Sequence, residues 1–102
     1  MRIFIQIASY RDPELVKTIK SIIENARNPK NLRFGICRQY HPEDGFDSLE
    51  EYKDDNRFRV IDVLYSESKG VCWARNLTQT LYEGEEYTMQ IDSHMRFEKN
   101  WD

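Results

Sequence analysis

The sequence predicts an α/β fold, in which a mostly parallel sheet carries helices on both faces. Three observations lead to this prediction. Residues 3–8 form an almost continuous apolar run, which is typical of a strand that is covered on both sides. Strand-like segments then alternate with segments whose apolar residues recur at helical spacing. Polar residues, finally, follow directly after the predicted strands, where parallel sheets bind their ligands.

The first half of the chain predicts a strand, a helix and a second strand. Asp12-Pro13 is a typical helix start, because Asp accepts free N–H groups and Pro presets the backbone of the first turn. Apolar residues recur at helical spacing over 15–23, until Asn28-Pro29 ends the pattern. Alternation of apolar and polar residues over 32–38 predicts the second strand.

The second half of the chain continues the alternation. Segment 40–57 is acid-rich with little periodicity, so we expect a solvated polar excursion with one short helix rather than a metal site. β-Forming residues over 58–65 predict the third strand, and 66–70 is the turn after it. Helical spacing over 71–81 precedes a fourth strand at 86–91. Right-handed crossovers between these strands place the helices on the faces of the sheet.

Composition excludes several classes of protein. Hydrophobic residues make up 39% and charged residues 32% of the chain, which suits one folded domain over residues 1–102. With a net charge of -3, we expect no strong electrostatic attraction to nucleic acid. No apolar run is long enough for a signal peptide or a transmembrane segment, which points to a cytoplasmic location. Cys37 and Cys72 lack metal-site spacing, so we expect reduced, semi-buried thiols.

The strand ends select the candidate site residues. Ligands bind parallel sheets outside the carboxyl ends of the strands, near the point where the strand order reverses. This rule selects segments 8–11, 38–40, 66–70 and 92–94. In the first of them, backbone groups could meet a nucleotide, and the ring of Tyr10 is the natural stacking candidate. Any strand-to-helix turn that ends in Asp-Pro has a similar composition, however.

Asp92 and His94 stand two residues apart at the end of the predicted fourth strand, and they are candidate metal ligands. In an extended strand such residues point the same way about 7 Å apart, so a turn at Ser93 is needed to bring them onto one cation. A mixed oxygen and nitrogen ligand set suits Mn²⁺ better than Ca²⁺ and also admits Mg²⁺. The spacing fits equally well with a turn that Asp92 caps and a histidine on the surface.

Arg75 lies one turn inside the predicted helix at 71–81, whose N-terminus favours phosphate or carboxylate groups. Its guanidinium could hold an anion through two hydrogen bonds. A lone arginine more commonly pairs with one of the many acids, so both interpretations stay open. His41, within the polar excursion, is expected to be solvated.

Several segments, taken together, resemble a known family. The GlcNAc-transferases that modify hydroxylated proline or threonine side chains of polypeptides are similar in IFIQIASYRDPEL, FGICRQ, SKGVCWARN, LYEGEEY and QIDSHMRF. The pieces GVCWAR and IDSH also resemble the polypeptide GalNAc-transferases, whose Asp-x-His motif replaces the commoner Asp-x-Asp. The resemblance implies a Rossmann-like GT-A fold, a UDP-sugar donor such as UDP-GlcNAc, a divalent cation, usually Mn²⁺, and transfer with retention of configuration.

The resemblance also implies roles for individual residues. Asp92 and His94 would ligate the cation and so take part in catalysis, and Arg75 would face the nucleotide. The residues around the uridine would be Ala8, Ser9, Tyr10, Arg11 and Gln39, and Gln90 would approach the sugar. Because the chain ends at Trp101-Asp102, directly after the metal motif, the resemblance implies the N-terminal, nucleotide-sugar-binding part of a GT-A domain. This truncated part alone is expected to be incomplete for transfer.

We therefore weigh three hypotheses. The first is a glycosyltransferase domain, in which the sugar passes from UDP to a hydroxyl acceptor on a polypeptide or a glycan. The second is a module of the same fold that binds a nucleotide without transfer. The third is an α/β interaction module in which Asp92, His94 and Arg75 are only caps and surface pairs. Metal-dependent UDP binding separates the third hypothesis from the other two.

Overall fold

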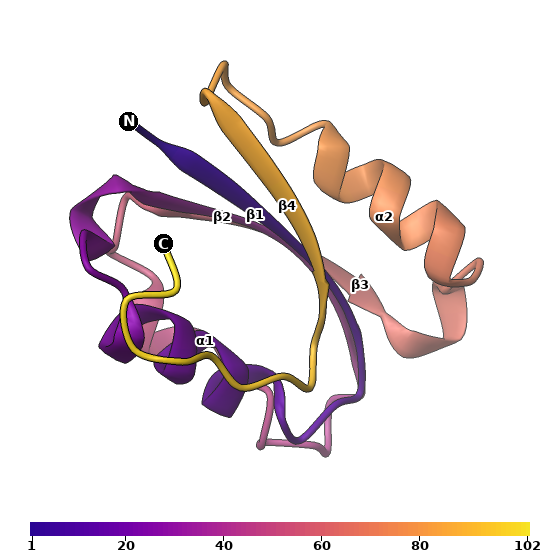
Figure 1. Ribbon diagram of the computed structural model, residues 1–102. Helices are drawn as coiled ribbons and strands as arrows, with labels where there is room; N and C mark the ends of the chain where they lie inside the picture. The colour runs from indigo at the N-terminus through magenta and orange to yellow at the C-terminus, as the bar shows by residue number, and fades with distance from the viewer.

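The computed structural model describes residues 1–102 as a four-stranded parallel sheet with a helix on each face (Figure 1). The elements follow in the order β1 (Ile3–Tyr10), α1 (Leu15–Asn25), β2 (Leu32–Tyr40), β3 (Phe58–Leu64), α2 (Val71–Gln79) and β4 (Tyr87–Asp92). Short 3-10 turns are η1 (Pro29–Asn31), η2 (Glu50–Tyr52) and η3 (Tyr65–Glu67). The predicted α/β fold is confirmed. Neither helix has the length and hydrophobicity that a membrane crossing requires.

The strand order is β3-β2-β1-β4, and every neighbouring pair is parallel. The chain moves outward from β1 through β2 to β3, then returns over α2 to place β4 on the other side of β1. With right-handed connections, this reversal requires that α1 and α2 cover opposite faces, as Figure 1 shows. The strand order therefore reverses between β1 and β4, where sheets of this kind bind ligands.

The main core lies between the sheet and α1. Alternate residues of each strand point to this face, and the helical spacing of the apolar residues in α1 gathers them into one stripe that packs against the sheet. The buried apolar cluster comprises Ile5, Ile7, Leu15, Ile19, Ile22, Leu32, Phe34, Ile36, Leu49 and Ile91. Each such side chain stabilises the fold by about 1.5–3 kcal/mol through removal of apolar surface from water.

The C-terminal segment runs along α1 after β4 ends (yellow in Figure 1). The backbone N–H of Met95 donates to the hydroxyl of Thr18 at 2.9 Å, and that of Phe97 donates to the hydroxyl of Ser21 at 2.8 Å. Further on, the indole N–H of Trp101 donates to the carbonyl oxygen of Ile22 at 2.9 Å. Side-chain hydroxyls on α1 therefore hold the backbone that follows the predicted metal motif.

The face that α2 covers is packed closely around a glycine. A Cβ built on Gly35 would lie 2.4 Å from Cζ of Phe4 and 3.3 Å from the carbonyl oxygen of Thr78. Thr78 also donates from its hydroxyl to the buried side chain of Gln6 at 3.0 Å. The absence of a side chain at Gly35 is thus what allows the Phe4 ring and α2 to lie against the sheet.

Gly35→Ala is expected to destabilise the protein by about 1–3 kcal/mol, because the Phe4 ring has to leave its packed position. This cost exceeds the roughly 0.5–1 kcal/mol that a strand gains when alanine replaces glycine. Urea unfolding measures the change. Gly45→Ala is the matched control, since nothing lies within 4 Å of its added Cβ. Equal stability of the Gly35→Ala protein and the wild type would contradict this account of the packing.

β1 and β2 both extend two residues beyond the ends that their apolar patterns predict. The parallel ladder continues through the pairs Ser9 with Arg38 and Tyr10 with Gln39, and β2 pairs with β3 up to Tyr40. These residues are polar or aromatic, so apolar alternation no longer marks them as strand. Backbone pairing with a neighbouring strand extends the sheet beyond the apolar pattern.

α1 begins two residues later than the predicted start at Asp12-Pro13. The carboxylate of Asp12 accepts the backbone N–H of Glu14 at 2.8 Å, and its carbonyl oxygen accepts that of Leu15 at 3.3 Å. Asp12 therefore shapes a turn before the helix, and no side chain caps the helix itself. The helix predicted over 71–81 is two residues shorter in the structure. α2 ends at Gln79 because the backbone continues with hydrogen bonds of the 3-10 type.

Both cysteines are free thiols, but neither is half-buried as predicted. Cys37 is buried on β2, and this burial raises the pKa of its thiol. Cys72 is exposed in the first turn of α2. The buried side of α2 is formed by Ala74 and Thr78, and a residue two positions before Ala74 points away from that side.

Candidate functional site

The carboxyl ends of β1, β2 and β4 lie at one edge of the sheet, and their register decides which residues share a face. Ala8 pairs with Cys37 on one side and with Asp92 on the other. Paired residues of parallel strands point to the same face, and the fully buried Ile7 points to the α1 face. Ala8 and Asp92 therefore belong to the face that α2 covers.

A hollow of about 250 Å³ lies on this face, between the ends of β1 and β2 and the start of α2. We call it the α2 hollow, and its lining residues are Ala8, Tyr10, Gln39, Ser68, Gly70 and Val71. The first three are residues predicted around the uridine, and the next two belong to a segment that the strand-end rule selected. Drug-sized ligands occupy about 300–1,000 Å³, so the hollow has room for only part of a nucleotide sugar.

Gln39 forms the floor of the α2 hollow, and both ends of its side-chain amide are engaged. Gln39 is only 3% exposed. Its Nε2 donates to the carbonyl oxygen of Ser9 at 3.0 Å, and its Oε1 accepts a very short hydrogen bond from the hydroxyl of Ser68. The hydroxyl of Ser9 is buried without a hydrogen-bond partner. In this structure, then, the buried side chain of Gln39 lines the hollow, whereas the buried side chain of Ser9 does not.

Arg11 follows β1 directly but does not line the α2 hollow, and the polar excursion holds its side chain. Its backbone has a φ of 46°, which is unusual for a residue other than glycine, and its N–H donates to the carbonyl oxygen of Gln39 at 2.9 Å. Its guanidinium donates to both carboxylate oxygens of Asp44, at 2.8 and 3.3 Å, and this lowers the pKa of Asp44. The guanidinium also lies 5.4 Å from the centre of the Tyr65 ring.

The prediction that His41 is solvated is only partly correct, because its ring is partly buried. Its ring packs against Tyr65 with 4.6 Å between the ring centres, and its Nδ1 accepts the backbone N–H of Glu43 at 3.1 Å. The polar excursion therefore folds back over the end of β1. Its arrangement depends on contacts with η3, which no local pattern in 40–57 could have indicated.

Arg75 and Asp92 meet beside the α2 hollow. Nη2 of Arg75 lies 3.4 Å from Oδ1 of Asp92, and both side chains are partly exposed. Of the two interpretations that the sequence left open for Arg75, pairing with an acid is the one that the structure contains. A pair this exposed contributes only about 0–1 kcal/mol, so an anion or a cation can displace it easily. Gln90 is exposed two positions before Asp92, on the same face of β4.

The chain bends at Ser93, between Asp92 and His94, where joint ligation of one cation would require a turn. The imidazole is 64% exposed, and its Nδ1 lies 3.2 Å from Oδ2 of Asp12. The hydroxyl of Ser93 donates to the same carboxylate oxygen at 2.5 Å. Partial burial pushes the pKa of Asp12 upward, but the hydrogen bonds from Ser93, the Glu14 N–H and His94 outweigh it and lower that pKa.

Sequence reasoning missed Asp12 as a residue of this site. Its position after β1 marked it as a helix start, and 82 residues separate it from His94. No spacing rule connects residues that far apart. The strand-end rule places both near the same edge, but only the folded chain brings Asp12 against the turn at Ser93.

Asp92 and His94 carry side chains of the types that bind divalent cations. No group of three His, Cys, Asp or Glu side chains is arranged to hold a metal ion. The carboxylate of Asp92 and the imidazole of His94 would supply two ligands from the protein. Mg²⁺ and similar cations in nucleotide sites commonly have one or two protein ligands and complete their coordination with phosphate oxygens and water.

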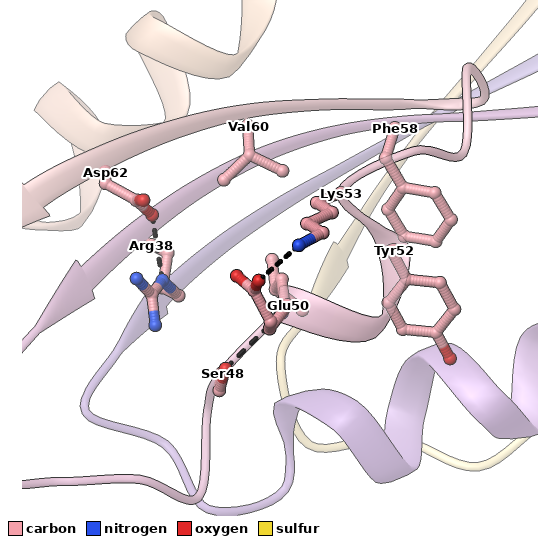
Figure 2. Close-up of a pocket in the computed structure, with 9 residues that line it drawn as sticks. Arg38, Ser48, Glu50, Tyr52, Lys53, Phe58, Val60 and Asp62 are labelled. Atoms are coloured by element: carbon pink, nitrogen blue, oxygen red, sulfur yellow. Dashed lines mark hydrogen bonds and ion pairs between the residues drawn. The ribbon is translucent and has the colours of Figure 1, made fainter.

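A second hollow, of about 280 Å³, lies on the opposite face between η2 and β3 (Figure 2). Its lining residues are Arg38, Ser48, Leu49, Glu50, Tyr52, Lys53, Phe58, Val60 and Asp62. Its cations are already paired, because Arg38 bonds to Asp62 at 2.8 Å and Lys53 to Glu50 at 2.9 Å, as Figure 2 shows. The hollow lies away from the strand-order reversal and offers no free charge to a phosphate.

Asp47 was assigned to a solvated acidic face, and this prediction is wrong for it. The residue is fully buried, and neither carboxylate oxygen has a hydrogen-bond partner. Burial raises the pKa of Asp47, although the Arg38 guanidinium, 3.7 Å away, acts in the opposite direction. The charged form of Asp47 is therefore less stable in the folded chain than in the unfolded one.

Asp47→Asn is expected to raise the melting temperature near neutral pH. The penalty from Asp47 is absent below its unfolded pKa, grows as the pH rises, and is complete above its raised folded pKa. The gap between variant and wild type should therefore close as the solution is acidified, and each 1 kcal/mol corresponds to about 4–8 °C. Thermal unfolding followed by circular dichroism across this pH range measures the gap.

Glu85→Gln is the control with the opposite sign. Burial pushes the pKa of Glu85 upward, but the Arg59 guanidinium at 2.8 Å outweighs it and lowers that pKa. The ionised Glu85 stabilises the folded chain above its unfolded pKa, and this contribution is lost as the pH falls through the folded pKa. Glu85→Gln should therefore be less stable than the wild type at neutral pH. A melting temperature for Asp47→Asn at or below that of the wild type at neutral pH would contradict the burial penalty.

Comparison with known proteins places these features in context. The sequence matches the model of a family described as "Glycosyltransferase (GlcNAc)" over residues 2–58 and again over 46–102. No curated protein sequence matches the chain. Among solved structures, the crystal structure of S. aureus TarS 1-349 is similar, with a TM-score of 0.67 and 17% sequence identity. The match covers 91% of this chain and 27% of the TarS chain, and at this identity it supports the fold alone.

Proposed function

The chain belongs to the GlcNAc glycosyltransferase family, and on this basis we propose that it binds a UDP-sugar, UDP-GlcNAc foremost, together with a divalent cation. The observation that carries this proposal is the meeting of Arg75 and Asp92, 3.4 Å apart, beside the α2 hollow. A cationic group for a diphosphate and a carboxylate for a metal ion thus stand together where the strand order reverses. TarS, matched over 27% of its chain, supports the fold on which this argument rests.

The α2 hollow is the proposed place of the nucleoside. Tyr10 is exposed at its edge and offers a ring for stacking, while the small side chain of Ala8 leaves room beside it. Gly70, with a φ of 102°, leads into α2, and no side chain caps the first turn of that helix. The free N–H groups of this turn favour an anion, which suits the diphosphate.

Arg75 and the turn after β4 are the proposed place of the diphosphate and the cation. In this arrangement Arg75 leaves Asp92 and binds phosphate oxygens, while Asp92 and His94 hold Mn²⁺ or Mg²⁺. The cation supplies Lewis-acid stabilisation of the charge that develops on UDP as the bond from the sugar to the diphosphate breaks. In this proposal Gln90, which is exposed on the same face of β4, approaches the sugar.

The acceptor in this proposal is a hydroxyl group, on a serine, threonine or hydroxyproline of a polypeptide or on a glycan. Its oxygen forms the new bond to the anomeric carbon of the sugar, UDP leaves with the electron pair of the broken bond, and the proton of the hydroxyl passes to the departing diphosphate. The resemblance of the motifs to polypeptide GlcNAc-transferases supports the polypeptide acceptor. Ala8 on β1, Arg75 on α2 and Asp92 on β4 lie on the same side of the sheet. This arrangement supports a binding site for the sugar nucleotide within the chain itself.

Calorimetric titration of UDP in the presence of Mn²⁺, repeated with a chelator, tests the proposal. We expect UDP to bind with Mn²⁺ and to bind much more weakly once the metal is removed. ADP serves as the comparison that reports on selection of the base. If UDP does not bind to the folded protein with or without Mn²⁺, the proposed donor site is wrong.

A further inference from the structure

The turn after β4, which carries His94, is held by side chains near the start of α1. Oδ2 of Asp12 accepts the hydroxyl of Ser93 at 2.5 Å and lies 3.2 Å from Nδ1 of His94. Oδ1 of the same carboxylate accepts the backbone N–H of Glu14 at 2.8 Å. One side chain thus connects the turn after β1 with the turn after β4.

Thr18 holds the same turn from the other side. Its buried hydroxyl donates to the carbonyl oxygen of Ser93 at 2.9 Å and accepts the backbone N–H of Met95 at 2.9 Å. The backbone is therefore fixed immediately before and after His94. The contact with Asp12 is what sets the direction of the exposed imidazole.

This contact also decides which ring nitrogen of His94 carries the proton. A carboxylate can only accept hydrogen bonds, so a neutral imidazole that faces Asp12 through Nδ1 has its proton on that nitrogen. Nε2 then keeps its lone pair, which is the form that binds a metal ion. A carboxylate behind a metal-binding histidine commonly fixes the ring in this way.

We infer that Asp12 is a positioning residue for the cation: through Nδ1–H of His94 it turns Nε2 toward the metal ion. The inference rests on the proposed donor site, which gives His94 a cation to bind. Asp12 itself does not touch the cation or the sugar. Loss of such a partner typically weakens metal binding by about 10–100-fold.

The tautomer of His94 can be measured without metal or nucleotide, by ¹⁵N NMR at a pH where the imidazole is neutral. We expect the proton on Nδ1. His41 provides an internal reference of the opposite kind, because its Nδ1 accepts the backbone N–H of Glu43 at 3.1 Å and its proton is therefore on Nε2. The two histidines of the chain should thus give opposite tautomers in one spectrum.

Asp12→Asn tests the consequence for the cation. The amide keeps the size of the side chain but presents an N–H group toward Nδ1 of His94, which favours the tautomer with the proton on Nε2. We expect the Mn²⁺ affinity, measured by calorimetry at saturating UDP, to fall about 10–100-fold. Asp62→Asn, which removes a carboxylate of β3 that pairs with Arg38, should leave both the tautomer and the affinity unchanged.

The outcomes separate this inference from the donor-site proposal. A His94 proton on Nε2 in the wild type overturns the inference, and so does unchanged Mn²⁺ affinity in Asp12→Asn when His94→Ala abolishes Mn²⁺ binding. In both cases the donor site stands. If the wild type binds no Mn²⁺, the donor-site proposal fails and the inference fails with it. Should Asp12→Asn not fold, the tautomer of the wild type decides.

Discussion

Asp92→Asn is expected to weaken UDP binding in the presence of Mn²⁺ by about 100-fold, equivalent to about 2.7 kcal/mol. The cation would lose the one carboxylate that the chain provides, and an amide oxygen carries no charge to replace it. The same change frees Arg75, which lies 3.4 Å from Asp92 in the wild type. UDP binding without metal should therefore stay the same or become tighter. A loss of UDP affinity with Mn²⁺, but no loss without it, distinguishes a metal ligand from a residue that only supports the fold.

Glu86→Gln is the matched control for this prediction. The Glu86 carboxylate is 59% exposed, against 57% for Asp92, and it lies at the opposite end of β4. Its replacement should leave UDP binding unchanged under both conditions. Calorimetry on both variants provides the measurement. If Asp92→Asn binds UDP and Mn²⁺ as tightly as the wild type, Asp92 is not a ligand, and the surface-pair interpretation is correct.

Phe34→Ala is expected to lower the free energy of unfolding by about 3–5 kcal/mol. Phe34 is fully buried at the centre of the sheet, and its ring stacks on that of Phe58 with 4.5 Å between the ring centres. Phe58 in turn stacks on Tyr52 of η2 at 4.3 Å. Removal of the first ring leaves a cavity and also loosens the segment that covers β3. Such a loss is a large part of the about 5–15 kcal/mol that stabilises a typical domain.

Urea unfolding measures this loss, and the dependence of the free energy on urea concentration should stay the same if only stability changes. Phe46→Ala is the control, because this phenylalanine is exposed on the polar excursion and its removal should change stability by less than about 0.5 kcal/mol. A loss below 1 kcal/mol for Phe34→Ala would mean that the sheet and η2 close over the vacated space.

Local patterns were sufficient for the strands and helices, because each pattern reflects a choice made within a few residues. The apolar run in β1 and the helical spacing in α1 required no knowledge of their neighbours. The ends of elements were less predictable. β1 and β2 continue to Tyr10 and Tyr40 because backbone pairing extends a strand through residues that are not apolar.

The candidate site was predictable at the level of segments. The rule for strand ends selected Tyr10, Gln39, Gly70 and Asp92, and all of these line the α2 hollow or lie beside it. The orientation of single side chains was not predictable. Gln39 is turned inward and bonded at both ends of its amide, and Asp47 is buried although its neighbours are polar.

The sequence by itself determined the order of the elements, the parallel α/β class, the resemblance to a GlcNAc-transferase family and the edge of the sheet at which its polar residues gather. Only the tertiary structure decided that Arg75 pairs with Asp92, that Asp12 holds His94, and that Gln39 joins β1 to the turn after β3. The physical reason is distance along the chain. Apolar periodicity acts over neighbouring residues, whereas a hydrogen bond between residues dozens of positions apart depends on how the packed strands and helices place them.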